Sequence, residues 1–172
     1  MRHESGFTVV ELLVVIAVIA TLSVIAVAGW LGFLPSYRLR TAVDDLQADM
    51  QITRLKAIKE NEMTTLRFFG NDAYRAFIDT DEDGALDNGE EIFIDRILPA
   101  GVTLLHPATD ADYAQYNTRG LPSDPVVDEG GKSFRLKNGK GQYLGIRMEV
   151  SGAFSVQTSG TGSDGTWQDQ YE

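Results

Sequence analysis

The sequence predicts an α+β protein in which one long N-terminal helix precedes a domain of antiparallel β-sheet. Three observations predict this class. Residues 7–34 form an apolar run of 28 residues that contains a single charged side chain, Glu11. Residues 36–60 carry apolar side chains at three- and four-residue steps, which is the period of a helix with one buried face. Beyond residue 61 the pattern changes to short runs of period two, which indicate strands.

The apolar run is long enough to cross a membrane. Leu12–Leu34 has 23 residues, and about 20 apolar residues span the hydrocarbon core as a helix. A secretory signal has a shorter apolar region of about 7–15 residues, followed by a cleavage site between small residues. Residues 26–28 (Ala-Val-Ala) offer such a site. A secreted soluble protein released after Ala28 is therefore an alternative, which the length of the run and the acid within it disfavour.

The start of the apolar run carries a specific motif. The sequence of residues 6–13 is GFTVVELL, and it resembles the prepilin signature of type IV pilins and type II secretion pseudopilins. The resemblance implies that a prepilin peptidase removes the leader 1–6 by cutting between Gly6 and Phe7. It also implies that this peptidase and N-methyltransferase methylates the new amino group of Phe7. Glu11 then becomes the fifth residue of the mature chain.

Glu11 is a candidate assembly residue. A charge near the bilayer centre costs about 2.5–3.5 kcal/mol, so an acid in such a segment needs a partner. Cleavage creates a cationic amine at Phe7, and residues four apart share a helix face. In a filament, the amine of one subunit would meet Glu11 of its neighbour and fix the axial register, because removing one partner of a buried pair costs about 3–5 kcal/mol. The alternatives are that Glu11 reaches the headgroups or pairs with its own amine.

The predicted helix continues beyond the membrane segment. We expect Pro35 to kink or loosen it, because proline lacks the N–H donor. The helical stripe consists of Leu39, Val43, Leu46, Met50, Thr53 and Ala57. The predicted organisation is a leader 1–6, a transmembrane and filament-core helix 7–35, an amphipathic helix 36–60, a β domain 61–158 and a flexible C-terminal tail 159–172.

The second half resembles a particular branch of the pilin-like proteins. Eight candidate strands are Met63–Phe69, Ala73–Asp79, Glu91–Leu98, Val102–His106, Tyr113–Thr118, Lys132–Leu136, Tyr143–Val150 and Ala153–Thr158. Their succession, with residues 46–61, 116–120 and 132–152, is similar to the GspH/FimT pseudopilin family. The resemblance implies a type IV pilin-like fold with a long helix packed on two small antiparallel sheets. Some DNA-binding members carry arginines after the last turn glycine, whereas Ala153 and Phe154 follow Gly152 here.

The loop between the second and third candidate strands fits the calcium pattern D-x-D-x-D-G-x5-E at each specified position. From residue 79 to 91 it has seven acids and no Lys or Arg. A structural Ca²⁺ is therefore one interpretation, and a solvated acidic hairpin loop built on Asp-Gly and Asn-Gly turns is the other, because both flanks are strand-like rather than helical. The candidate ligands are Asp79, Asp81, Asp83, Ala85 through its carbonyl, Asp87 and Glu90, around the turn glycine Gly84.

A basic segment offers an alternative function. Phosphate contacts and stacking on Phe134 and Tyr143 could bind DNA, as in a DNA-uptake minor pilin. The other interpretation, which we favour, is the polar face of two strands paired with acidic loops. The overall charge of −10 also disfavours nucleic acid. The basic residues are Lys132, Arg135, Lys137, Lys140 and Arg147.

Together these patterns predict a structural subunit and not an enzyme. The chain has no cysteine and two histidines, His3 in the leader and His106 beside a proline, and it has no nucleophile elbow or phosphate-binding glycine loop. We expect a minor pseudopilin or pilin, single-pass in the inner membrane, with its C-terminal domain in the periplasm. Its expected partners are membrane lipid before assembly, prepilin peptidase, the inner-membrane assembly platform and other pilins in a helical filament. No cofactor other than calcium is expected. Secretion, pilus and competence machines all remain open.

Overall fold

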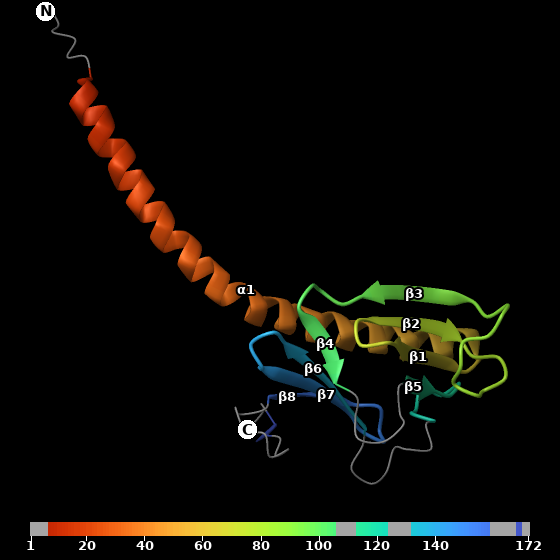
Figure 1. Cartoon of the computed structure of the whole chain (residues 1–172). Coiled ribbons are helices and arrows are strands. Elements are labelled where there is room, and N and C mark those ends of the chain that lie inside the picture. The colour runs from red at the N-terminus through yellow and green to blue at the C-terminus, as the bar shows by residue number, and fades with distance from the viewer. Residues whose placement is uncertain (1–6, 106–112, 124–131, 159–167, 170–172) are drawn as a thin grey trace, which may run out of the picture. The chain divides into compact units, whose positions relative to one another are not determined.

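The computed structural model describes residues 7–105, 113–123, 132–158 and 168–169. The helix α1 runs from Val9 to Glu60 with Pro35 inside it (Figure 1). The chain divides into two compact units, residues 1–34 and 35–172, which are described separately. The helix continues through Pro35, so the predicted kink or loosening there stays a prediction.

The first unit holds the N-terminal part of α1. Its segment Val9–Ala26 is long and apolar enough to cross a membrane, and none of that segment is buried within the protein. The side chains of Leu22, Val24 and Ile25 are each at least 60% exposed. Exposed apolar side chains on every face of a helix require an apolar environment, which lipid or neighbouring helices provide.

The second unit contains two antiparallel sheets (Figure 1). The four-stranded sheet has the order β3-β2-β1-β5, and the five-stranded sheet has the order β4-β6-β7-β8-β9. Eight of the strands lie within two residues of the predicted bounds; β9 was not predicted, because two residues in a Gly-, Ser- and Thr-rich tail carry no period. The strands are β1 (Thr64–Phe69), β2 (Ala73–Ile78), β3 (Ile92–Ile97), β4 (Val102–Leu105), β5 (Tyr113–Tyr116), β6 (Lys132–Asn138), β7 (Tyr143–Met148), β8 (Phe154–Thr158) and β9 (Gln168–Asp169).

One apolar core joins the C-terminal part of α1 to both sheets. Phe68 on β1 and Phe134 on β6 bring the two sheets into contact, with ring centroids 5.5 Å apart. The predicted helical stripe is confirmed as the buried face, since each of its six residues is at most 2% exposed. The core therefore follows from the helical period on one side and from strand alternation on the other.

Candidate functional site

Glu11 closes a capping box at the start of α1. Thr8 precedes the first helical residue, and the backbone N–H of Glu11 donates to Thr8 Oγ1 at 3.3 Å. In return, Glu11 Oε2 accepts from the backbone N–H of Thr8 at 3.0 Å and from its hydroxyl at 2.9 Å. This reciprocal arrangement satisfies N–H groups that have no partner within the helix. The T-x-x-E signature was present in the sequence, but the prediction considered only the charge of Glu11.

The carboxylate of Glu11 nevertheless has no cationic partner among the described residues. In that part of the chain, the carboxylate accepts hydrogen bonds from two neutral donors, the backbone N–H and the hydroxyl of Thr8. Phe7 is 77% exposed, and Gly6 lies outside the described residues. The geometry therefore places an uncompensated negative charge one helical turn from the cleavage position.

A second site lies where α1 meets one turn from each sheet. Arg54 on α1 donates from Nε to the carbonyl of Gly120 at 2.8 Å and from Nη1 to the carbonyl of Gly152 at 3.0 Å. Both glycines have positive φ, +70° and +78°. A Cβ at Gly120 would lie 2.6 Å from Ile58 Cδ1, and a Cβ at Gly152 would lie 3.1 Å from Arg54 Cζ. These two turn segments, which carry part of the resemblance to the GspH/FimT family, are thus held by one guanidinium.

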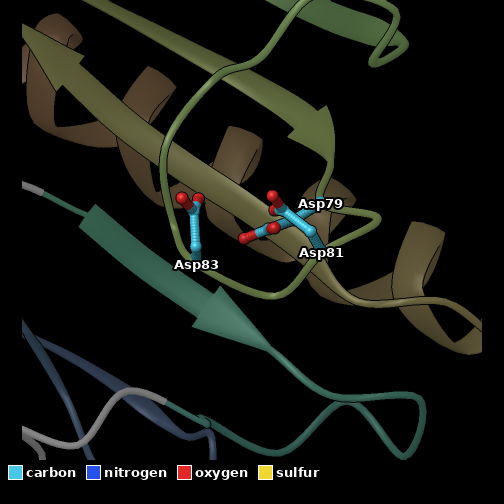
Figure 2. Close-up of side chains that lie close together, drawn as sticks. All are labelled: Asp79, Asp81 and Asp83. Carbon is cyan, nitrogen blue, oxygen red and sulfur yellow. The ribbon is translucent and has the colours of Figure 1, made fainter.

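The acidic loop between β2 and β3 brings three of its predicted ligands together. Single carboxylate oxygens of Asp79, Asp81 and Asp83 all lie within 4.8 Å of one another (Figure 2). The pKa of the Asp81 carboxyl is raised above its usual value, first by desolvation and then by the negative charge of Asp83. Such an arrangement destabilises itself unless a cation compensates it.

The remaining predicted ligands belong to the same loop. Glu90 Oε2 accepts from the backbone N–H of Asp87 at 3.0 Å, and Glu90 Oε1 accepts from the backbone N–H of Thr80 at 2.9 Å. The backbone N–H of Ala85 donates to Asp83 Oδ1 at 2.6 Å. Glu90 therefore closes the loop on itself and lies outside the cluster of three aspartates.

The comparisons with known proteins agree with this architecture. A family model described as "Type II transport protein GspH" matches residues 42–167, more than half of the chain. The chain belongs to the GspH family. A second family model, the "Prokaryotic N-terminal methylation motif", matches residues 1–27. No match was found among curated protein sequences.

Among solved structures, this GspH-family chain is similar to the crystal structure of the type IV minor pilin FimU of Pseudomonas aeruginosa strain PAO1. The TM-score is 0.53 at 13% identity, over 81% of this chain and 99% of that chain. The likeness confirms the predicted type IV pilin-like fold. It also confirms the division into a long helix and antiparallel sheets.

GspH-family membership determines the class of function. The family consists of structural pilin and pseudopilin subunits and not of enzymes. Membership together with the methylation motif implies processing by a prepilin peptidase and assembly with other pilins. The apolar N-terminal helix and the motif also indicate membrane anchoring and an extracytoplasmic filament.

Lys132 does not share a surface with the other basic residues of β6 in this GspH-family chain. Lys132 is 4% exposed; its ammonium donates to the carbonyl of Tyr113 and lies 4.7 Å from the centre of that ring. Arg135 and Lys137 alternate with the buried Phe134 and therefore lie on the other face of the sheet. The face of β6 that would bind DNA thus lacks one of the cations that the sequence suggested, because strand alternation turns it inward.

Proposed function

We propose that this GspH-family chain is a minor subunit of the pseudopilus of a type II protein secretion system. Before assembly it would lie in the inner membrane by its single apolar helix, with residues 36–172 in the periplasm. The name of the matching family model, a type II transport protein, supports this machine. The type IV pilus is the alternative, and the fold likeness to a type IV minor pilin suits either machine.

The observation that carries the proposal is the isolated charge of Glu11. It is the single charged residue between positions 7 and 34, and its hydrogen bonds in the described structure come from Thr8. Cleavage between Gly6 and Phe7 would leave a cationic amine that methylation keeps cationic. When helices pack in a filament, the amine of one subunit would compensate Glu11 of the next away from water. That pairing would set the axial position of each subunit.

The capping box makes it possible to separate the charge of Glu11 from its structural role. Glu11→Gln removes the charge and keeps the cap, because glutamine also closes a capping box. Thr8→Ala keeps the charge and removes the capping hydroxyl. Both variants would be produced in cells that supply the partner subunits. The amount recovered with sheared filaments would be measured by immunoblot, and intact mass would report leader removal and the methyl group.

We expect Glu11→Gln to be processed normally and to be largely absent from filaments, whereas Thr8→Ala is processed and incorporated. Equal incorporation of Glu11→Gln and the unchanged chain would contradict the proposal. Loss of Thr8→Ala to the same extent as Glu11→Gln would show that the cap, and not the charge, limits assembly. Restoration of secretion in cells that lack their own GspH-family subunit would identify the type II machine, and restoration of pili would identify the alternative.

A further inference from the structure

The Asp79–Glu90 loop contains a buried carboxylate oxygen that the fold leaves without a partner. Asp79 is 1% exposed. Its Oδ2 accepts hydrogen bonds from Thr65 Oγ1 at 2.7 Å, Gln115 Nε2 at 2.8 Å and the backbone N–H of Gly84 at 2.9 Å. Its Oδ1 is equally buried and accepts no hydrogen bond from any described residue. A buried polar group without a partner is destabilising and requires an explanation.

Among the described residues, no side-chain cation supplies that partner. Asp79 forms no ion pair with a described Lys, Arg or His. Arg67, a cation that contacts the loop's backbone, donates to the carbonyl of Gly84 and lies 5.7 Å from the Tyr113 ring. The donors that do reach Asp79 are neutral, and single carboxylate oxygens of Asp79, Asp81 and Asp83 lie within 4.8 Å of one another. Asp79 thus has a buried oxygen without a hydrogen-bond donor on a carboxylate close to two others, which is the environment of a cation ligand.

The backbone around the cluster is already folded for such a role. Gly84 has a φ of +75°, and a Cβ at this position would lie 2.8 Å from the Tyr113 ring. A side chain is therefore excluded both by backbone conformation and by space. This glycine turns the chain so that its N–H reaches Asp79 Oδ2, which leaves Oδ1 for another ligand. The hydrogen bonds from β1 and β5 hold Asp79 in place through Thr65 and Gln115.

We propose that this loop binds one calcium ion through Asp79 Oδ1 and the carboxylates of Asp81 and Asp83. The Ala85 carbonyl, Asp87 and Glu90 would complete the six to eight oxygens that calcium prefers. Glu90 would exchange its hydrogen bonds to Thr80 and Asp87 for the ion. Because Asp79 is hydrogen-bonded to β1 and β5 of the four-stranded sheet, the ion would stabilise that sheet. This site lies in the second unit and does not depend on the role of Glu11.

The position of Tyr113 provides a direct probe of the site. Its ring lies against Gly84, so a bound Tb³⁺ ion, which replaces Ca²⁺ at oxygen sites, should show luminescence sensitised by this tyrosine. The full chain in detergent micelles, stripped of metal with a chelator, would be titrated with Tb³⁺ and then with Ca²⁺ or Mg²⁺. Calcium-dependent thermal unfolding would be followed by circular dichroism. Tyr113→Phe removes the sensitiser and should abolish most of the signal.

The decisive variant is Asp81→Asn. Asp81 is exposed, so the substitution removes a ligand charge and leaves the buried contacts of Asp79 intact. Asp44→Asn is the matched control, because Asp44 is exposed on α1 and its loss changes the net charge equally. We expect calcium binding in the weak extracellular range of about 10⁻⁴–10⁻³ M. The affinity should fall on the order of tenfold or more in Asp81→Asn and stay unchanged in Asp44→Asn.

Three results would overturn the proposal. The first is no sensitised luminescence and no thermal stabilisation at about 10 mM calcium, roughly ten times the upper end of that range. The second is equal affinity in Asp81→Asn and the unchanged chain, which would mean diffuse attraction to an acidic surface. The third is that Mg²⁺ displaces Tb³⁺ as effectively as Ca²⁺ does. A calcium site should favour Ca²⁺, because Mg²⁺ requires a smaller and more rigid site.

Discussion

Arg54 is predicted to be the main polar connection between α1 and the two sheets. Arg54→Met keeps the apolar stem of the side chain and removes its two hydrogen bonds to the carbonyls of Gly120 and Gly152. A hydrogen bond from a charged donor contributes about 1.5–3 kcal/mol. Because Arg54 is half-buried, water can replace part of each bond, and the lower end applies. The expected loss in the free energy of unfolding is therefore about 3 kcal/mol.

The assay is urea unfolding of the second unit, residues 35–172, followed by near-UV circular dichroism. With a slope of about 2 kcal/mol per molar urea, the midpoint should fall by about 1.5 M. Arg40→Met is the matched control, because Arg40 is exposed on the same helix, and it should change the free energy of unfolding by less than about 0.5 kcal/mol. An Arg54→Met variant as stable as the Arg40→Met variant would refute the assignment. Arg54→Lys should give an intermediate loss, because lysine has no planar fork for two carbonyls.

Three other predictions concern the second unit. Gly120→Ala should lower the free energy of unfolding by about 1–3 kcal/mol more than Gly101→Ala, because both glycines have positive φ but of the two only Gly120 lacks room for a Cβ. Thermal midpoints would compare the two variants, and equal losses would contradict the predicted clash. Asp49→Ala should lower the free energy of unfolding by about 2–3 kcal/mol, because the hydroxyl of Tyr74 donates to Asp49 at 2.8 Å and would be buried without a partner. Urea midpoints would measure this loss, and a loss below about 1 kcal/mol would contradict the prediction. Burial, and for Tyr74 the hydrogen bond to Asp49, raises the pKa of Tyr74 and Tyr116. The unfolded chain therefore loses these protons first, and stability should fall above pH about 10 by about 1.4 kcal/mol per pH unit for each tyrosine. Tyr74→Phe should remove the contribution of one tyrosine to this fall. If the free energy of unfolding of Tyr74→Phe fell as steeply with pH as that of the unchanged chain, the prediction would be wrong.

Local patterns predicted most of the fold of this chain. The period of α1 identified the buried stripe from Leu39 to Ala57, and eight strands followed from alternation and turn residues. These features depend on neighbouring residues, so a single sequence contains them. The N-terminal motif was equally local. The short strand Gln168–Asp169 was missed because it forms by pairing with β8 and has no pattern of its own.

The long-range polar contacts could not be predicted in the same way. Asp49 is buried on α1, where it accepts from Tyr74 and from Arg96 Nε at 3.0 Å, 47 residues away. Arg54 has partners 66 and 98 residues away. No spacing in the sequence connects such residues, because the topology of the two sheets decides which side chains meet. Lys132 shows the same limit, since the sequence places it on the same face of the strand as Phe134 but does not reveal its partner on β5.

The pairing of Glu11 with the amine of a neighbouring subunit can be measured by zero-length cross-linking. A membrane-permeant carbodiimide joins an amine to a carboxylate only where the two groups are in contact. Applied to assembled filaments, it should give a cross-linked peptide that contains Glu11 of this chain and the N-terminus of another subunit, identified by mass spectrometry with isotope-labelled chains. A link found only between Phe7 and Glu11 of one chain would contradict the account. The account would also be contradicted if filaments of the unchanged chain gave no link and the Glu11→Gln chain entered filaments normally.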